Sequence, residues 1–248
     1  MSLPKLMKLV ARAIGTTVFT LTATLFAASQ SAAPQTGPAV GTAIGSGAEV
    51  SFQIERPGLA VPKFTIQVRE DGSGRYQAEQ TERPATLTSM RGEAAQHIDR
   101  TLVLSAATTA KIFKAAHELN DFNMDCTSKA KNVADMGKKT LSYAGADGHG
   151  SCVYHYSENK SVGMLTDTFL AIAYTMDEGR TLEFLHRYDR LGLDAEMISL
   201  SQEVEAGRAL ELGTISPTLA AIADDTAVIQ RVRLKAAKML EPVTTGNR

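Results

Sequence analysis

Residues 63–80 read KFTIQVREDGSGRYQAEQ and contain two runs in which apolar and polar side chains alternate. Phe64, Ile66 and Val68 occupy every second position, which is the pattern of a strand that buries one face. Between the runs, EDGSG supplies residues that accept the positive φ angles of a tight turn. RYQAEQ then returns as a second strand. The stretch therefore predicts an antiparallel hairpin with one solvent-exposed face.

The same alternation precedes the hairpin in VSFQIE, residues 50–55, so we expect a three-stranded antiparallel meander. RTLVLS, residues 100–105, is a further candidate strand, and Ser105 is a suitable N-cap for the helical pattern of AATTAKIFKAAHELN. KKTLSY and SCVYHY, joined by the turn-rich AGADGHG, predict a second hairpin over residues 138–156. SVGMLTDTFLAIAYTM, residues 161–176, then has apolar side chains at helical spacing.

From Asp177 onwards the apolar period is helical throughout. One predicted helix begins behind Asp194 as its cap and ends at Gly207, and Ser216 followed by Pro217 predicts the cap and first residue of another. The last predicted helix carries one apolar stripe, formed by Val228, Ile229, Val232, Ala236, Met239 and Leu240. The predicted fold class is α+β, with antiparallel β-hairpins packed with two helices and followed by an all-helical C-terminal region.

The amino-terminal residues 1–33 have the layout of a secretory signal peptide. Lys5, Lys8 and Arg12 form a positive head, and an uncharged stretch and small residues follow it. A retained membrane anchor is the alternative, but the uncharged stretch is short and contains five threonines. We therefore predict export to the periplasm or the medium.

The predicted organisation is a signal peptide (1–33), a flexible linker (34–48), an α+β domain (49–176) and a helical region (177–248). Cleavage of the signal removes three basic residues and no acidic one, which leaves 23 Lys and Arg against 27 Asp and Glu and a net charge of −4. This charge gives no general reason to bind nucleic acid or an anionic membrane. No later stretch is apolar for long enough to span a bilayer.

Cys126 and Cys152 are the two cysteines of the chain. In an oxidising compartment the simplest interpretation is a disulfide. Two alternatives stay open, namely free thiols and a metal site of His149, Cys152 and His155. Residues three apart on a strand point to opposite faces, so the predicted strand disfavours a site that uses both Cys152 and His155.

Two resemblances extend this interpretation. SPTLAAIADDTAVIQRVRLKAAKML, residues 216–240, resembles one HEAT-type helical repeat, with Val232, Arg233 and Ala236 where such repeats place Val, Arg and Ala. FTIQVREDGSGRY, GKKTLSY and HRYDRLGLDAE resemble uncharacterised exported bacterial proteins of unknown function over most of residues 50–240. The second resemblance implies export and a shared architecture, and it implies no activity.

Catalytic motifs give little support for an enzyme. The sequence has no Gly-x-Ser-x-Gly, phosphate loop, His-Glu-x-x-His or Cys-x-x-Cys. SENK, residues 157–160, has the Ser-x-x-Lys spacing of serine acyl enzymes, but these residues are predicted to form a turn instead of the start of a helix.

Two charged clusters each allow two interpretations. His186, Asp189 and Arg190 have helical spacing and form either a ligand-binding face or ion pairs at a helix end. We favour ion pairs, with Glu183 and Arg187 as one more pair. Four lysines either bind an anion together or are solvated residues of loops and strand edges, and we favour the second interpretation. The group is Lys129, Lys131, Lys138 and Lys139.

The predicted function is that of an exported, non-catalytic binding or cell-envelope factor. Arg231, Lys235 and Lys238 lie away from the apolar stripe of the last helix and are the predicted partner-facing residues. The partner is a protein of unknown identity, and we assign no cofactor, no metal ligand and no catalytic residue. The alternatives are an exported hydrolase with an unrecognised active site and a metal-binding protein.

Overall fold

The computed structural model describes residues 47–80, 96–130 and 136–245, which belong to one compact unit beginning at Gly45. The predicted signal peptide (1–33), most of the predicted linker (34–48) and Lys131 lie outside the described residues. The strands are β1 (Glu49–Glu55), β2 (Lys63–Arg69), β3 (Ser73–Gln80), β4 (Gln96–Val103), β5 (Lys138–Ala144) and β6 (His149–Tyr154). The helices are α1 (Ala106–Glu118), α2 (Lys160–Tyr188), α3 (Leu193–Glu205), α4 (Ser216–Asp224) and α5 (Gln230–Thr245), with short 3₁₀ turns η1 (Asn120–Phe122) and η2 (Leu212–Ile215).

The six strands form one antiparallel sheet in the order β4-β3-β2-β1-β5-β6. This order confirms the predicted meander and the predicted second hairpin. Strand β4 begins at Gln96 instead of Arg100, because the residues around Ile98 also pair with β3, where Ala78 is the partner. The alternation in β1 and β2 gives the burial that it predicts, since the apolar positions are buried and the polar positions between them are not.

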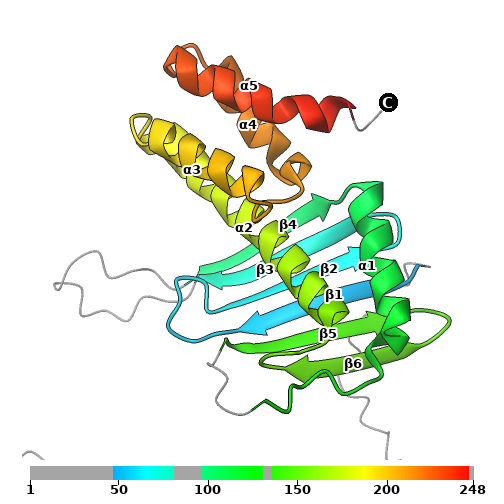
Figure 1. The fold of residues 1–248 in the computed structure, drawn as a ribbon. Helices are drawn as coiled ribbons and strands as arrows, with labels where there is room; N and C mark the ends of the chain where they lie inside the picture. Colours follow the sequence, from blue (N-terminus) through cyan, green and yellow to red (C-terminus); the bar gives the residue numbers. More distant parts are fainter. Residues whose placement is uncertain (1–46, 81–95, 131–135, 246–248) are drawn as a thin grey trace, which may run out of the picture. The chain divides into compact units, whose positions relative to one another are not determined.

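Helix α1 and the first half of α2 cover the apolar face of this sheet (Figure 1). The ring of Phe169 on α2 stacks on the ring of Phe52 on β1, with centroids 5.2 Å apart and planes 4° from parallel. Ser105 caps α1 as predicted, because its hydroxyl accepts a hydrogen bond from the Thr108 amide. The sheet, its two covering helices and the helices that follow confirm the α+β class.

Helix α2 contains 29 residues and belongs to two hydrophobic cores. Its first half contributes Leu165 and Phe169 to the core under the sheet, and its second half contributes Leu182 to a core among the C-terminal helices. The predicted boundary at Asp177 stays a prediction, and it falls inside this uninterrupted helix. Gly179 lets η2 approach the helix, because a Cβ at this position would collide with Ile215.

The second core joins the end of α2 to α3, η2, α4 and α5. Its buried residues are Leu182, Leu193, Met197, Leu200, Ala209, Ile215, Leu219, Ile222, Val228, Val232, Ala236 and Met239. The predicted stripe of the last helix is therefore buried except at Ile229, which is 44% exposed, and at Leu240, which is partly buried. Val228 and Ile229 both precede α5, which begins at Gln230, and of these two only Val228 is buried.

Two of the predicted caps are wrong. The N-cap of α3 is Gly192, and Asp194 lies in the first turn, where its carboxylate pairs with Arg231 at 2.8 Å. The N-cap of α4 is Ile215, so Ser216 is already helical and its hydroxyl donates to the carbonyl of Gly213 at 2.9 Å. Asp194 is thus the second residue of α3 and Ser216 the first residue of α4, and each side chain has a partner other than the amides at the start of its helix.

A carboxylate from the C-terminal half of the chain caps α1. Glu211 has a left-handed backbone conformation, with φ 59°. Its Oε2 accepts from the Ser105 amide at 2.7 Å, and its Oε1 accepts from the hydroxyls of Ser105 and Thr108. The Ser105 amide and the two hydroxyls belong to the start of α1, where the first amide groups have no partner inside the helix. Glu211 therefore ties the segment before η2 to the helix that covers the sheet.

A buried tyrosine makes a second connection, between β3 and the middle of α2. The hydroxyl of Tyr76 donates to Asp177 Oδ1 at 2.8 Å, and Arg180 donates to the same oxygen at 3.1 Å. Burial, followed by the charge of Asp177, raises the pKa of Tyr76 far above its usual value. Desolvation also raises the pKa of Asp177, because its hydrogen bonds compensate only part of its burial.

Replacing Glu211 by Gln tests the first connection. Both carboxylate oxygens of Glu211 accept hydrogen bonds, whereas the NH2 group of Gln only donates. At least one donor at the start of α1 then loses its acceptor, so we expect the free energy of unfolding to fall by about 1–3 kcal/mol. Urea unfolding followed by circular dichroism gives the value. Glu205→Gln, an exposed carboxylate on α3, is the matched control and should change stability very little. Equal stability of Glu211→Gln and wild type would show that the cap is not formed.

Candidate functional site

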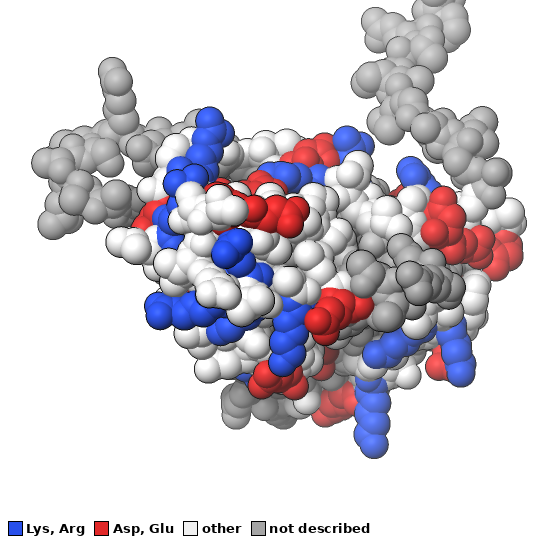
Figure 2. All heavy atoms as spheres, turned by 90° about the horizontal axis from the view of Figure 1, so that it is seen from above, with Lys and Arg blue, Asp and Glu red and all other residues white. Residues whose placement is uncertain are grey.

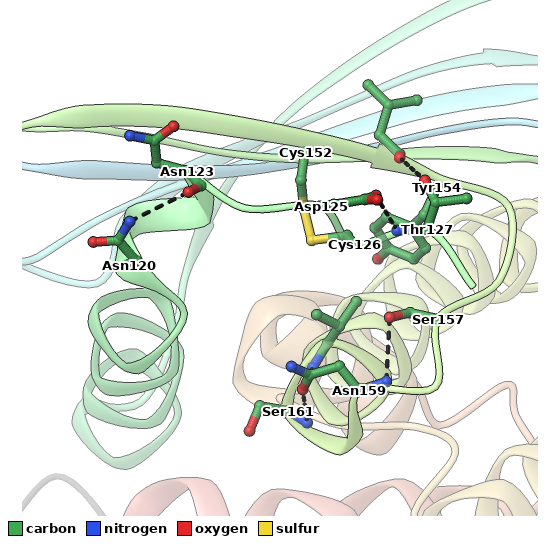
Figure 3. The surroundings of a disulfide bond; sticks show 12 residues. Asn120, Asn123, Asp125, Cys126, Thr127, Cys152, Tyr154, Ser157, Asn159 and Ser161 are labelled. Atoms are coloured by element: carbon green, nitrogen blue, oxygen red, sulfur yellow. Dashed lines mark hydrogen bonds between the residues drawn. A yellow bond between two sulfur atoms is a disulfide. The ribbon is translucent and has the colours of Figure 1, made fainter. Parts of the chain in front are cut away.

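Cys126 and Cys152 form a disulfide, with their Cα atoms 5.8 Å apart, which confirms the predicted pairing. The segment after Cys126 then runs along the edge of β6 (Figure 3). The Thr127 hydroxyl donates to the carbonyl of Val153 at 3.1 Å, and the Ser128 amide donates to the carbonyl of Tyr156 at 3.0 Å. The disulfide therefore fixes the end of β6 and the direction in which the chain leaves it.

The alternative metal site is not assembled. Cys152 is buried and bonded to Cys126, whereas the side chains of His149 and His155 are exposed. Within the described part of the chain, no group of three His, Cys, Asp or Glu side chains is arranged to hold a metal ion.

The chain turns sharply between β6 and α2. The Ser157 hydroxyl accepts from the Asn159 amide at 3.3 Å, and Asn159 Oδ1 accepts from the amides of Ser161 and Val162 at 2.9 and 3.3 Å (Figure 3). Asn159 is thus the N-cap of α2, and Lys160 is its first residue. The prediction that all four residues of SENK form a turn is correct only in that Ser157 lies before the helix, because residues 157–159 connect β6 to α2 and Lys160 is already helical.

A cavity of about 370 Å³ lies between this turn, the ends of β5 and β6, and the first turns of α2. Helix α2 contributes one stripe of its surface, namely Lys160, Gly163, Asp167 and Leu170. Side chains of both polar and apolar character line the cavity. Thr166 of α2 lines the cavity as well, and the remaining lining residues are Met136, Lys139, Tyr154, His155, Tyr156, Ser157, Glu158 and Asn159.

Gly163 leaves this cavity open. A Cβ atom built on Gly163 would have no heavy atom within 4 Å beyond its own helix and chain neighbours. A glycine inside a helix costs about 1 kcal/mol relative to alanine, so its place in α2 is not favoured by helix propensity. No close neighbour requires it either. Because residue 163 has no side chain, the cavity extends to the surface of α2 at this position.

Two hydroxyl groups meet at the wall of the cavity. The Thr166 hydroxyl donates to the carbonyl of Val162 at 2.7 Å, so the Tyr154 hydroxyl must be the donor in its 2.6 Å bond to Thr166. Burial raises the pKa of Tyr154 to about 12, and the nearby charge of Asp167 acts in the same direction. Tyr154 is therefore neutral at physiological pH, and its oxygen keeps the capacity to accept a hydrogen bond.

Lys139 corrects the prediction for the lysine group. It is buried, and its ammonium group donates to the carbonyls of His155, Met136 and Gly137 at 2.8, 3.0 and 3.4 Å. Strand β5 lies between β1 and β6, so neither Lys139 nor Lys138 is a strand-edge residue. Lys138 and Lys129 are exposed. Lys139 supports the turn after β6, and with it one wall of the cavity.

The predicted cluster at His186, Asp189 and Arg190 does not form in the expected way. His186 and Arg190 both contact Asp225, at 2.8 and 3.5 Å. Helix α2 ends at Tyr188, so Asp189 leaves the helical face and accepts from the Gly192 amide instead. The ion pairs at a helix end are present, but their carboxylate comes from the end of α4.

The predicted pair of Glu183 and Arg187 is also replaced. Glu183 pairs with Arg100 of β4 at 2.8 Å, and Arg187 lies over the ring of Tyr188, 5.3 Å from its centroid. Tertiary contacts from a distant strand thus decide which charges meet on this part of α2.

The predicted partner-facing residues of α5 do not share one environment. Arg231 pairs with Asp194, Lys235 is half-buried and Lys238 is exposed. On the side of the molecule seen from above the view of Figure 1, basic and acidic side chains are interspersed (Figure 2). A role for these three residues in partner binding stays a prediction.

Sequence inspection missed a pair of carboxyl groups, Glu178 on α2 and Glu196 on α3. The Oε2 atom of Glu178 is buried and has no hydrogen-bond partner in the described residues. Desolvation, and then the hydrogen bond and charge of Glu196, raise the pKa of Glu178 to about 8. The two residues lie on different helices, so no local sequence pattern indicates their contact.

This pair predicts a pH dependence of stability. The pKa of Glu178 is about 8 in the folded protein against 4.5 for an unperturbed glutamate, so the folded state binds more protons between these values. The free energy of unfolding should therefore fall as pH rises from about 5 to about 8. Glu178→Gln removes this titration, and its stability should vary less with pH over the same range. Urea unfolding at a series of pH values measures this, and identical profiles for variant and wild type would contradict the assignment.

Removal of the disulfide tests its structural role. Replacing Cys126 and Cys152 together by Ala should lower the free energy of unfolding by about 2–5 kcal/mol, because the unfolded chain loses a constraint. Chemical denaturation of both proteins gives the difference. A double variant as stable as the wild type, or titratable thiols in the native wild type, would contradict the pairing.

The chain matches no protein-family model, and no curated protein has significant sequence similarity to it. The HEAT-type resemblance and the resemblance to exported bacterial proteins therefore stay predictions. Of the helices in residues 47–80, 96–130 and 136–245, none is long and apolar enough to cross a lipid bilayer.

Proposed function

We propose that the chain is an exported, non-catalytic binding protein, and that its cavity at the start of α2 holds a small molecule with an apolar part and a hydrogen-bonding group. The amino-terminal pattern of residues 1–33 supports export, and the Cys126–Cys152 disulfide is compatible with an oxidising compartment. The predicted protein partner is a separate matter, for which the interspersed charges around α5 give no specific support.

The observation that carries this proposal is the open space at Gly163. The cavity of about 370 Å³ has the size of small-molecule sites, which are usually about 300–1,000 Å³. Leu170 and Met136 offer apolar surface, and the oxygen of Tyr154 offers a hydrogen-bond acceptor. Such sites combine apolar walls with a few placed polar groups.

Hydrolysis has less support at the same place. A serine nucleophile requires a neighbouring base that removes its proton. Ser157 accepts a hydrogen bond from the Asn159 amide, and no hydrogen bond among the described residues joins its hydroxyl to a histidine or a carboxylate. The cavity has the composition of a binding site, and it lacks the contacts of an acyl-transfer site.

Substitution of Gly163 tests the proposal. Gly163→Phe should place a ring in the cavity without displacing the backbone, whereas Gly163→Ala should leave most of it open and stabilise α2 by about 0.5–1 kcal/mol. Phenol, indole and 2-phenylethanol serve as probes at millimolar concentration. Chemical-shift changes of the Met136 methyl group report their binding.

Wild type and Gly163→Ala should bind at least one probe, and Gly163→Phe should bind none. Lys114→Phe, on the exposed face of α1, is the control for an added phenylalanine and should bind like wild type. Thermal unfolding establishes that each variant is folded. If the wild type binds no probe, or if Gly163→Phe binds as well as wild type, the cavity is not the binding site.

A further inference from the structure

We infer that the ligand of this cavity carries a protonated amine and that the carboxylate of Asp167 binds it. This inference rests on the proposed binding function, and it adds the chemical class of the ligand.

Asp167 is a carboxylate at the cavity without a counter-charge of its own. In the described part of the chain, no side chain or amide donates a hydrogen bond to it, and no cation forms an ion pair with it. The positions one turn away on the helix are Gly163 and Ala171, which carry no charge. Lys160 is seven residues away, about 10 Å along the helix axis. The wall therefore presents an acceptor for a cationic donor.

The surroundings of Asp167 also suit an organic cation. Tyr156 lines the same cavity and is 45% exposed, whereas Tyr154, also in the lining, is only 2% exposed. Tyrosine rings attract a cation placed over their faces. The Tyr154 hydroxyl donates its hydrogen bond to Thr166, so its oxygen has acceptor capacity for an ammonium group. Leu170, one turn beyond Asp167, supplies apolar surface for the rest of the ligand.

The basic side chains that line the cavity give less support for an anionic ligand than Asp167 gives for a cationic one. The ammonium group of Lys139 donates to three backbone carbonyl oxygens. Lys160 is exposed at the first residue of α2, and Glu158 lines the cavity close to it in sequence. An anionic ligand at Lys160 and the start of α2 is the rival interpretation, and the experiment includes it.

Three ligands of similar shape and different charge separate the possibilities. They are 2-phenylethylamine, which is cationic at pH 7, the neutral 2-phenylethanol and the anionic 3-phenylpropionate. Isothermal titration calorimetry or the Met136 methyl signal gives the affinities for wild type, Asp167→Asn and Glu205→Gln. The last variant removes one negative charge from α3, outside the cavity lining, and controls for net charge.

The amine should bind wild type and Glu205→Gln about tenfold more tightly than the alcohol, which corresponds to one charge-assisted hydrogen bond. Asp167→Asn should abolish this preference by weakening binding of the amine, whereas Glu205→Gln should keep it. Equal affinities for amine and alcohol, or tightest binding of the propionate, would overturn the inference while the binding function stands. A further outcome is that wild type binds phenol or indole, Gly163→Phe does not, and none of the three ligands binds wild type. The cavity is then a binding site, and the inferred ligand class is wrong. If no probe of either experiment binds wild type, both proposals fall.

Discussion

The structure depends on helix α2 packing against different partners with opposite sides of its surface. Met176 belongs to the core under the sheet, and Leu185 packs against the core of the C-terminal helices. Nine residues separate them, which is about two and a half helical turns and therefore half a revolution. In the middle of the helix both sides are covered, and small residues such as Ala171, Thr175 and Gly179 are buried there. One helix thus connects two cores that would otherwise share little apolar surface.

The other long-range contacts support this arrangement. Glu211 fastens the segment before η2 to α1, and Tyr76 fastens β3 to Asp177 near the middle of α2. The candidate site lies at the first turns of the same helix, where the Cys126–Cys152 disulfide, Lys139 and the Asn159 cap fix the incoming chain. The cavity walls are therefore held by covalent and hydrogen-bonded constraints, which favours a preformed binding site over a chain that orders on binding.

Much of the sheet follows from the sequence, because the period of two in VSFQIE and KFTIQVR assigns each side chain to a face. The disulfide follows from the presence of two cysteines in a chain expected to be exported. The continuity of α2 does not follow, since its apolar positions change sides and no single stripe marks it as one helix.

The cavity cannot be predicted from the sequence either. In the sequence, Gly163 is an ordinary helix-weakening residue. Only the folded arrangement of β5, β6 and the turn after β6 shows that it lines a cavity. Pairs such as Glu178 with Glu196, or His186 with Asp225, depend on helix packing and have no local signature.

Native-state hydrogen exchange tests most directly whether α2 unites the two cores. If α2 unites them, the slowest amides of β2, of α2 on both sides of Asp177, and of α5 should exchange with one common free energy of opening, equal to that of global unfolding. Phe169 and Leu182 on α2, Ile66 on β2 and Val232 on α5 are buried reporters for this comparison. If Leu182 and Val232 instead exchange through an opening that leaves Ile66 and Phe169 protected, the C-terminal helices unfold independently, and α2 does not unite the two cores.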